Sequence, residues 1–323
     1  RLASGAPVLP GIVGYDETVL PALENALLAG QDIVFLGERG QAKTRMARAL
    51  VSLLDPWLPV VKGGELNDDP DNPVSASARA LVAEHGGATP IEWLPRERRY
   101  AEKLATPDIT IADLIGEVDP IKVAEGRYLS DELTIHYCLV PRANRGIFAI
   151  NELPDLAERI QVGLLNILEE RDVQVRGFQV RLPLDLLVVA SANPEDYTSR
   201  GRIITPLKDR LGSQIRTHYP RTLDQEVAIV RQEQLRFPPA EGVPEVVMPA
   251  FMEELVAELS HLARRSPEIS QRSGVSVRVS VANVEVLEAA ALKRAVRLGE
   301  RAAAPRISDL GAVDRKSTRL NSS

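Results

Sequence analysis

The feature that most constrains this chain is a glycine-containing loop between a short apolar run and a helical pattern. The loop reads GERGQAKT and occupies residues 37–44. Residues 32–36 (DIVFL) predict a strand before it, and the spacing of apolar residues after it predicts a helix. A strand, a glycine-rich turn and a helix in this order are typical of loops whose backbone N–H groups surround phosphate. The sequence therefore predicts an α/β core with a phosphate site at this turn.

Each position of the loop has an expected role. The loop departs from the pattern G-x-x-x-x-G-K-[ST] only at Ala42, where that pattern has its last glycine. Lys43 is expected to pair with the phosphate oxygens of a nucleoside triphosphate, and the Thr44 hydroxyl is expected to bind Mg²⁺. The other positions would place their backbone around the phosphates: Gly37, Glu38, Arg39, Gly40, Gln41 and Ala42. We therefore expect ATP with Mg²⁺, the alternative being a chance match to the pattern.

A second apolar strand, residues 146–150 (GIFAI), ends at a polar pair. An ATPase with such a loop needs an acidic residue at the tip of a neighbouring strand, to polarise the attacking water or to hold the water shell of the metal. Glu152 is the candidate base. Asn151 occupies the metal side of the pair, where an aspartate is usual. The alternative for Glu152 is a carboxylate that caps the following helix.

Three further side chains are candidates for contact with the nucleotide. Asn193 follows the apolar strand 184–190 in VVASANP and could orient the lytic water, although Asn before Pro also starts turns. Arg210, in PLKDRL, could stabilise transition-state charge, or form a surface ion pair with Asp209. Arg278, in SVRVS, could reach the γ-phosphate from a second domain.

The remaining patterns predict the domain organisation. Strands that alternate with helices predict a mostly parallel sheet in residues 1–221, with a polar insertion at about 63–108 and a hairpin at 173–182. Residues 222–304 predict a small all-α lid. A capping box at Thr222 and Gln225 starts its first helix and Pro249 opens the next. A third helix would carry an apolar stripe of Val284, Leu287, Ala291, Ala295 and Leu298. Residues 305–323 are expected to be a disordered or artefactual tail.

Charge and composition narrow the class of partner. The net charge is −6, from 39 basic and 45 acidic residues, with no basic stripe that would neutralise many phosphates of a nucleic acid. No apolar run is long enough to span a bilayer, so we expect a cytoplasmic protein without membrane contact. The single cysteine, Cys138, excludes an internal disulfide.

Taken together, these motifs resemble the AAA+ ATPases, and within them the branch of the MoxR ATPases and the I subunit of magnesium chelatase. GERGQAKT resembles Walker A, GIFAINE Walker B, VVASANP sensor 1, PLKDRL the arginine-finger segment and SVRVS sensor 2. The stretch GEVDP…EGRYL…LVPRANRGIF and the hairpin VQVRGFQVRL are similar to the chelatase-like branch. The resemblance implies a homo-oligomeric ring, often of six subunits, in which Arg210 acts on the nucleotide of the next subunit. It also implies a partner with a von Willebrand factor A domain.

The expected function is ATP hydrolysis in a ring that remodels a partner protein or drives metal insertion. The alternative is a nucleotide-gated scaffold with little hydrolysis, because Asn151 replaces the Walker B aspartate. A transcription activator of the enhancer-binding type is less favoured, since the GAFTGA loop and a following helix-turn-helix are absent from the sequence.

Overall fold

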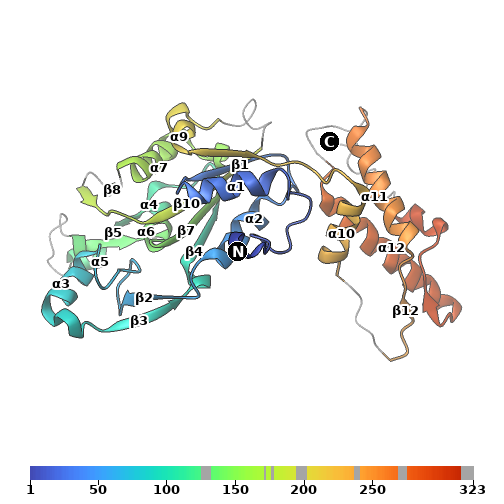
Figure 1. The fold of residues 1–323 in the computed structure, drawn as a ribbon, viewed down its shortest axis with the longest axis horizontal. Helices are drawn as coiled ribbons and strands as arrows, with labels where there is room; N and C mark the ends of the chain where they lie inside the picture. Colours follow the sequence, from blue (N-terminus) through green and yellow to red (C-terminus); the bar gives the residue numbers. More distant parts are fainter. Residues whose placement is uncertain are drawn as a thin grey trace. The chain divides into compact units, whose positions relative to one another are not determined.

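The structure is a computed structural model that describes residues 1–124, 132–170, 172–175, 178–193, 202–235, 241–267 and 275–313. The chain divides into two units, each defined by the contacts within it, and Figure 1 labels their helices and strands. The first consists of residues 1–12, 17–37 and 42–217. The second takes residues 13–16 and 38–41 together with the chain from His218 onward. Each unit is described by itself.

The first unit is built on a five-stranded sheet. Its strands are β1 (Ile33–Leu36), β4 (Tyr100–Leu104), β7 (Gly146–Asn151), β10 (Leu186–Ala192) and β11 (Ser213–Arg216). The spatial order is β11-β1-β10-β7-β4, and each adjacent pair is parallel. β10 therefore lies between β1 and β7, although it follows both in the chain. The carboxyl ends of parallel strands share one edge, so the turns after β1, β7 and β10 meet there.

Helices pack on this sheet because its strands carry apolar side chains on both faces. Val34, Phe148 and Val188 lie in a core with the buried side of α7, which includes Ile160 and Leu164. The helices of this unit are α1 (Val19–Leu28), α2 (Lys43–Ala49), α3 (Ala76–His85), α4 (Ile111–Leu114), α5 (Pro120–Ala124), α6 (Leu139–Arg142), α7 (Glu158–Glu170) and α9 (Thr205–Arg210). Short 3-10 turns are Leu2–Ser4, Leu50–Leu53, Gly86–Ala88, Arg96–Arg99, Glu132–Thr134 and Leu153–Asp155.

Three antiparallel strand pairs accompany the sheet: β2 (Trp57–Val61) with β3 (Ile91–Pro95), β5 (Gly116–Val118) with β6 (Ile135–Tyr137), and β8 (Asp172–Val175) with β9 (Phe178–Arg181). The pair β8–β9 confirms the predicted hairpin, while its turn at 176–177 lies outside the described residues, as does the EGRYL segment. The expected insertion at 63–108 also contains β4, a strand of the central sheet. In the strand order of the described residues β4 lies at the edge of the sheet, beside β7. Its sequence, YAEKL, lacks the apolar run that marked the other strands.

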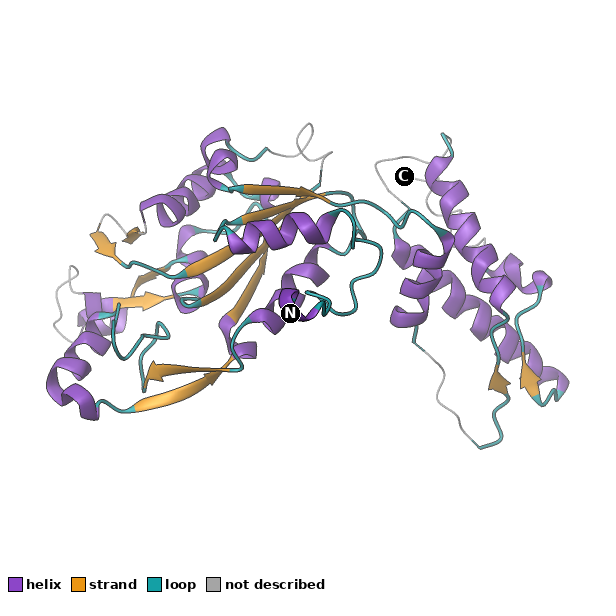
Figure 2. Cartoon of the chain, viewed as in Figure 1, coloured by secondary structure: helices purple, strands orange, loops and turns teal. Residues whose placement is uncertain are grey.

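The second unit is predominantly helical (Figure 2). It contains α10 (Leu223–Glu233), α11 (Ala250–Arg265) and α12 (Val277–Leu298), with a short parallel pair, β12 (Glu245–Val246) and β13 (Ala302–Ala303). Thr222 caps α10 by accepting a hydrogen bond from the Gln225 N–H. The Gln225 side chain, however, accepts from the Arg221 N–H rather than from that of Thr222, so the expected capping box is shifted by one residue.

The apolar stripe of α12 is buried except at its end. Val284 and Leu287 lie in a core with Met252 of α11, but Leu298 is 65% exposed because the helix ends there, before Gly299. The expected tail is also partly folded. Residues Ile307–Ala312 form a 3-10 turn, and Val313 packs into the same core. Residues 314–323 lie outside the described residues. In the described part of the chain, none of the helices has the length and apolar character needed to cross a membrane.

Candidate nucleotide-binding site

The predicted Walker motifs come together at the carboxyl edge of the sheet. Lys43, the first residue of α2, is buried, and its Nζ donates hydrogen bonds to the Gly37 carbonyl and to Asn193 Oδ1, the latter at 2.6 Å. The Asn193 amide nitrogen in turn donates to Glu152 Oε2 at 2.6 Å. One polar chain therefore joins the residues that follow β1, β10 and β7. The strand order produces this chain of contacts. Because β10 lies between β1 and β7, Asn193 at its end lies between Lys43 and Glu152.

A second polar chain links the hydroxyl of Thr44 to the side-chain amide of Asn151, on the expected metal side. Thr44 Oγ1 lies 3.1 Å from Asn151 Oδ1, and Ser191 Oγ lies 3.2 Å from the same oxygen. The Glu152 N–H donates to Ser191 Oγ at 3.2 Å, which ties both Asn151 and Glu152 to β10. Thr44 and Asn151 present oxygen atoms, the ligand type that Mg²⁺ prefers, so the expected metal side is chemically suited to that ion.

Glu102 on β4 extends this second chain and was not predicted from the sequence. Its Oε1 accepts a hydrogen bond from Asn151 Nδ2 at 2.7 Å. Arg48, one turn after Thr44 on α2, donates to both carboxylate oxygens, at 2.7 and 3.0 Å, and the Tyr100 hydroxyl donates to Oε2 at 3.0 Å. No sequence signal marked Glu102, because β4 had been assigned to an insertion.

The surroundings of Glu102 act on its pKa in opposite directions. Burial by itself would raise the pKa, since the side chain is only 21% exposed. Hydrogen bonds from Arg48, Tyr100 and Asn151 favour the charged form and outweigh burial, so the pKa of Glu102 lies below its ordinary value. The carboxylate is therefore ionised at neutral pH.

Two residues of the site have a left-handed backbone. Ala42, at the position of the usual glycine, has φ 56° and ψ 15°, and Glu152 has φ 56° and ψ 46°. L-residues rarely adopt this conformation, and strained backbone of this kind is frequent at functional sites. The backbone at Ala42 thus has the conformation for which the common motif uses glycine.

The middle of the predicted phosphate loop, residues 38–41, belongs to the second unit. The Tyr219 hydroxyl donates to the Arg39 carbonyl at 2.9 Å, and the Tyr15 hydroxyl lies 2.8 Å from the Gln41 carbonyl. Gln41 is buried, and its side chain accepts from the Glu38 N–H at 3.0 Å. Gly40 has φ 79°, and a Cβ there would lie 2.3 Å from Cβ of Ser276. This loop segment therefore requires glycine at position 40.

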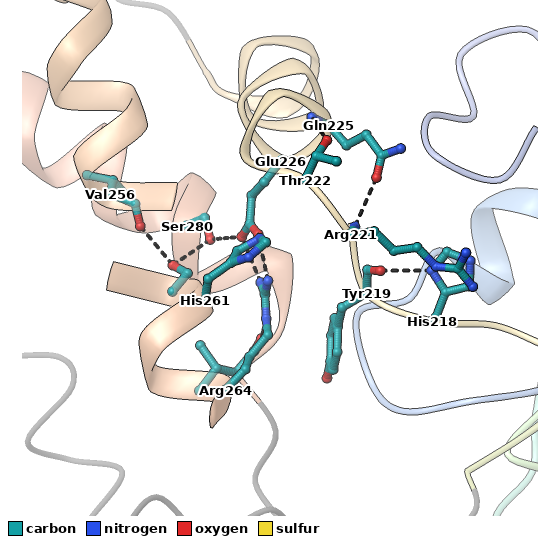
Figure 3. Close-up of polar contacts among 12 residues, drawn as sticks. His218, Tyr219, Arg221, Thr222, Gln225, Glu226, Val256, His261, Arg264 and Ser280 are labelled. Carbon is teal, nitrogen blue, oxygen red and sulfur yellow. Dashed lines mark hydrogen bonds and ion pairs between the residues drawn. The ribbon is translucent and has the colours of Figure 1, made fainter. Parts of the chain in front are cut away.

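A buried polar cluster in the same unit lies close to these contacts (Figure 3). Glu226 of α10 is fully buried and accepts hydrogen bonds from both terminal nitrogens of Arg264 on α11, at 2.6 and 2.7 Å. It also accepts from Ser280 of α12, and His261 Nε2 lies 2.8 Å from Oε2. The Arg264 guanidinium lies over the ring of Tyr219, 4.7 Å from its centre. The three helices of the second unit are thereby joined to the tyrosine that contacts the loop.

The two arginines predicted from the sequence are both exposed, each within its own unit. Arg210 is exposed in the last turn of α9, where its guanidinium donates to the Leu168 carbonyl at 2.7 Å. Arg278 is exposed in the first turn of α12, two residues after Ser276. Both roles remain predictions.

Comparison with known proteins places these motifs in a family context. Subunit ChlI of magnesium chelatase from Oryza sativa subsp. japonica is 29% identical over 270 residues, 78% of this chain and 58% of that protein. The 38 kDa magnesium-chelatase subunit of Acidiphilium rubrum is 30% identical over 233 residues, 68% of this chain and 61% of that protein. The chain thus spans less than two thirds of the length of these curated relatives. No model of a known protein family matches the sequence.

The fold comparison agrees with the sequence comparison. A solved structure of the complex between subunits BchI and BchD of magnesium chelatase contains a chain that aligns with 98% of this one, with 95% of its own length covered. The TM-score is 0.51 and the sequence identity 21%, which shows the fold alone. The parallel five-stranded sheet, flanked by helices and followed by a helical unit, is the predicted AAA+ architecture. The chain is thus a homologue of the magnesium-chelatase I subunits and has the AAA+ fold.

Proposed function

We propose that this protein binds ATP with Mg²⁺ through residues 37–44 and hydrolyses it as an AAA+ ATPase. The observation that carries the proposal is the polar chain from Lys43 through Asn193 to Glu152, with both side-chain contacts at 2.6 Å. A phosphate-binding lysine, an orienting amide and a carboxylate are the side chains that nucleotide hydrolysis needs side by side. These residues come from the segments that follow three different strands, β1, β10 and β7.

Each residue of the site has a defined task in this proposal. Lys43 pairs with the phosphate oxygens, and Glu152 accepts a proton from the attacking water, which Asn193 orients. Thr44 and Asn151 are the residues that would hold Mg²⁺, directly or through its water shell. When bound, the ion would neutralise charge on the phosphates. Asn193 contacts both Lys43 and Glu152, so it couples the position of the phosphate to the position of the base.

The test is phosphate release by the purified protein compared with that of Glu152→Gln. We expect Glu152→Gln to lose 10²- to 10⁴-fold in turnover, the usual contribution of a general base, and to keep its affinity for ATP. Lys43→Ala should lose nucleotide binding itself. Glu158→Gln, the same change at an exposed position of α7, should behave as wild type. The ATPase proposal is wrong if wild type shows no turnover above that of Glu152→Gln.

A nucleotide-gated scaffold is the second candidate, favoured by the amide at Asn151. It predicts that wild type binds ATP as tightly as Glu152→Gln does and hydrolyses it no faster. The phosphate-release measurement therefore distinguishes the two functions directly.

Assembly and client are proposals that rest on the resemblance. We propose a homo-oligomeric ring, with six subunits as the first expectation, and a partner that contains a von Willebrand factor A domain. Remodelling of that partner is the proposed output, and metal insertion would require further subunits. Identifying the protein that co-purifies with the chain when ATP is present, and not when it is absent, tests this partnership.

A further inference from the structure

The side chain of Asn151 is held between a hydroxyl and a carboxylate. Its Oδ1 faces Thr44 Oγ1 at 3.1 Å and Ser191 Oγ at 3.2 Å, and its Nδ2 faces Glu102 Oε1 at 2.7 Å. Asn151 stands where the Walker B aspartate would place a negative charge. A carboxylate beside Asn151 is thus supplied by the neighbouring strand, β4.

Glu102 determines which way the amide of Asn151 points. An ionised carboxylate can only accept hydrogen bonds, so it must face the NH₂ group of the amide. Hydroxyl groups can donate or accept, so Thr44 and Ser191 tolerate either end of the amide. Glu102 is therefore the contact that turns the oxygen of Asn151 toward Thr44. Without that carboxylate, the NH₂ group could face the metal side as readily as the oxygen.

The register of the sheet accounts for this contact. Glu102 pairs with Ala149 and Leu104 pairs with Asn151, so Glu102 and Asn151 are diagonal neighbours on one face. α2 lies on the same face, since Thr44 reaches Asn151 and Arg48, one turn later, reaches Glu102. The contact therefore depends on a strand pairing rather than on a flexible loop.

We propose that Glu102 is a positioning residue that takes over the role of the missing Walker B aspartate. It holds the Asn151 oxygen toward Thr44, and its negative charge strengthens that oxygen as an acceptor for Mg²⁺ or its water shell. This inference rests on the proposed nucleotide site. The competing explanation is an ordinary ion pair, in which Glu102 only fastens α2 to β4 through Arg48, whose side chain is 65% exposed.

The first experiment compares nucleotide affinity with and without the metal. The affinity of a fluorescent ADP analogue is measured in Mg²⁺ and in EDTA, for wild type and for Glu102→Gln. We expect Glu102→Gln to bind the Mg²⁺ form about 10-fold more weakly, the usual effect of removing a partner of a metal ligand, with unchanged affinity in EDTA. The EDTA value also shows that the variant is folded. Equal affinities of wild type and variant in Mg²⁺ would overturn the proposal.

Arg48→Gln is the matched control, because it breaks the same ion pair from the other side. It leaves the contact between Glu102 and Asn151 in place. The proposal predicts that Arg48→Gln keeps or increases the affinity for the Mg²⁺ form, since the carboxylate loses its competing cation. A loss equal to that of Glu102→Gln would show that only the ion pair matters.

The second experiment restores the aspartate. Asn151→Asp alone brings two carboxylates into hydrogen-bond range, where they repel each other. In that background Glu102→Gln removes the repulsion, so it should raise the affinity for the Mg²⁺ form instead of lowering it. A double-mutant cycle measures this reversal of sign. The proposal fails if Glu102→Gln has the same effect in both backgrounds.

The outcomes separate this inference from the proposed function. If wild type binds no nucleotide in either buffer, the nucleotide site is wrong and the role of Glu102 falls with it. If wild type binds the nucleotide with Mg²⁺ and the cycle shows no coupling between positions 102 and 151, the nucleotide site stands and only the role of Glu102 is wrong.

Discussion

Ala42 and Glu152 show how the site uses backbone conformations that most residues avoid. Both are left-handed; Ala42 directly precedes helix α2, and Glu152 directly follows strand β7. At Ala42 this conformation lets Lys43 begin α2 while the loop runs around the expected phosphates. At Glu152 it follows directly on β7 and precedes the turn Leu153–Asp155. Strained backbone conformations of this kind are common at active sites and ligand-binding sites.

Ala42→Gly should stabilise the protein. Relief of the left-handed conformation is worth about 1–2 kcal/mol, and the extra freedom of glycine in the unfolded chain offsets about 0.5–1 kcal/mol of it. We expect a net gain of roughly 0.5–1 kcal/mol in urea unfolding. Ala80→Gly, at an exposed position of helix α3, should instead lose about 1 kcal/mol. A loss at both positions would show that the conformation of Ala42 carries no strain.

At the scale of elements, a single carboxylate joins three helices of the second unit. Glu226 of α10 binds Arg264 of α11 and Ser280 of α12, and the hydroxyl oxygens of Ser280 and Ser260 of α11 lie 2.8 Å apart (Figure 3). Burying a carboxylate is costly unless partners satisfy it, and these contacts do so. The helices thus have one preferred relative arrangement, and Tyr219, stacked under Arg264, extends it to the loop carbonyl of Arg39.

Glu226→Ala should therefore destabilise the second unit strongly. Removing one partner of a buried pair leaves Arg264, only 11% exposed, without its counter-charge, and typically costs about 3–5 kcal/mol. Thermal unfolding followed by circular dichroism measures the loss. Glu258→Ala, at an exposed position of α11, is the matched control and should change stability by less than about 0.5 kcal/mol. Equal effects of the two variants would contradict a structural role for the Glu226 cluster.

At the scale of the whole molecule, the proposed ring assigns a role to an exposed arginine. Arg210 donates to the Leu168 carbonyl and is not part of the site formed by its own Lys43 and Glu152. An arginine that completes the site of a neighbouring subunit contributes about 10³- to 10⁵-fold to turnover in nucleotide hydrolases that use one. Arg210→Ala should lose turnover in this range and retain nucleotide affinity.

Mixing two inactive variants tests this role, because a mixed ring can contain sites in which both Glu152 and Arg210 are intact. Arg210→Ala subunits keep Glu152, and Glu152→Gln subunits keep Arg210. In mixed rings, a site with Glu152 from one subunit and Arg210 from the next should recover part of the wild-type phosphate release. A mixture that assembles and stays inactive would exclude Arg210 as the contributed residue.

The sequence by itself determined the local parts of this protein. The phosphate loop, the strands that end at Asn151 and near Asn193, and the helical character of the second unit follow from apolar periodicity and from turn residues, which act over a few positions. The relation to AAA+ proteins also followed from these motifs. Leu298 shows the limit of such patterns, since an apolar stripe does not show where the core beneath a helix ends.

Only the tertiary structure decided how these parts meet. Strand pairing joins residues far apart in the chain, and the apolar pattern of one segment does not identify its partner strand. The insertion of β10 between β1 and β7 brings Asn193 into contact with Lys43 and Glu152. The pairing of β4 with β7 places Glu102 against Asn151, which makes a polar edge strand part of the candidate metal side. The sequence shows an amide where an aspartate is usual, and the sheet supplies a carboxylate beside it.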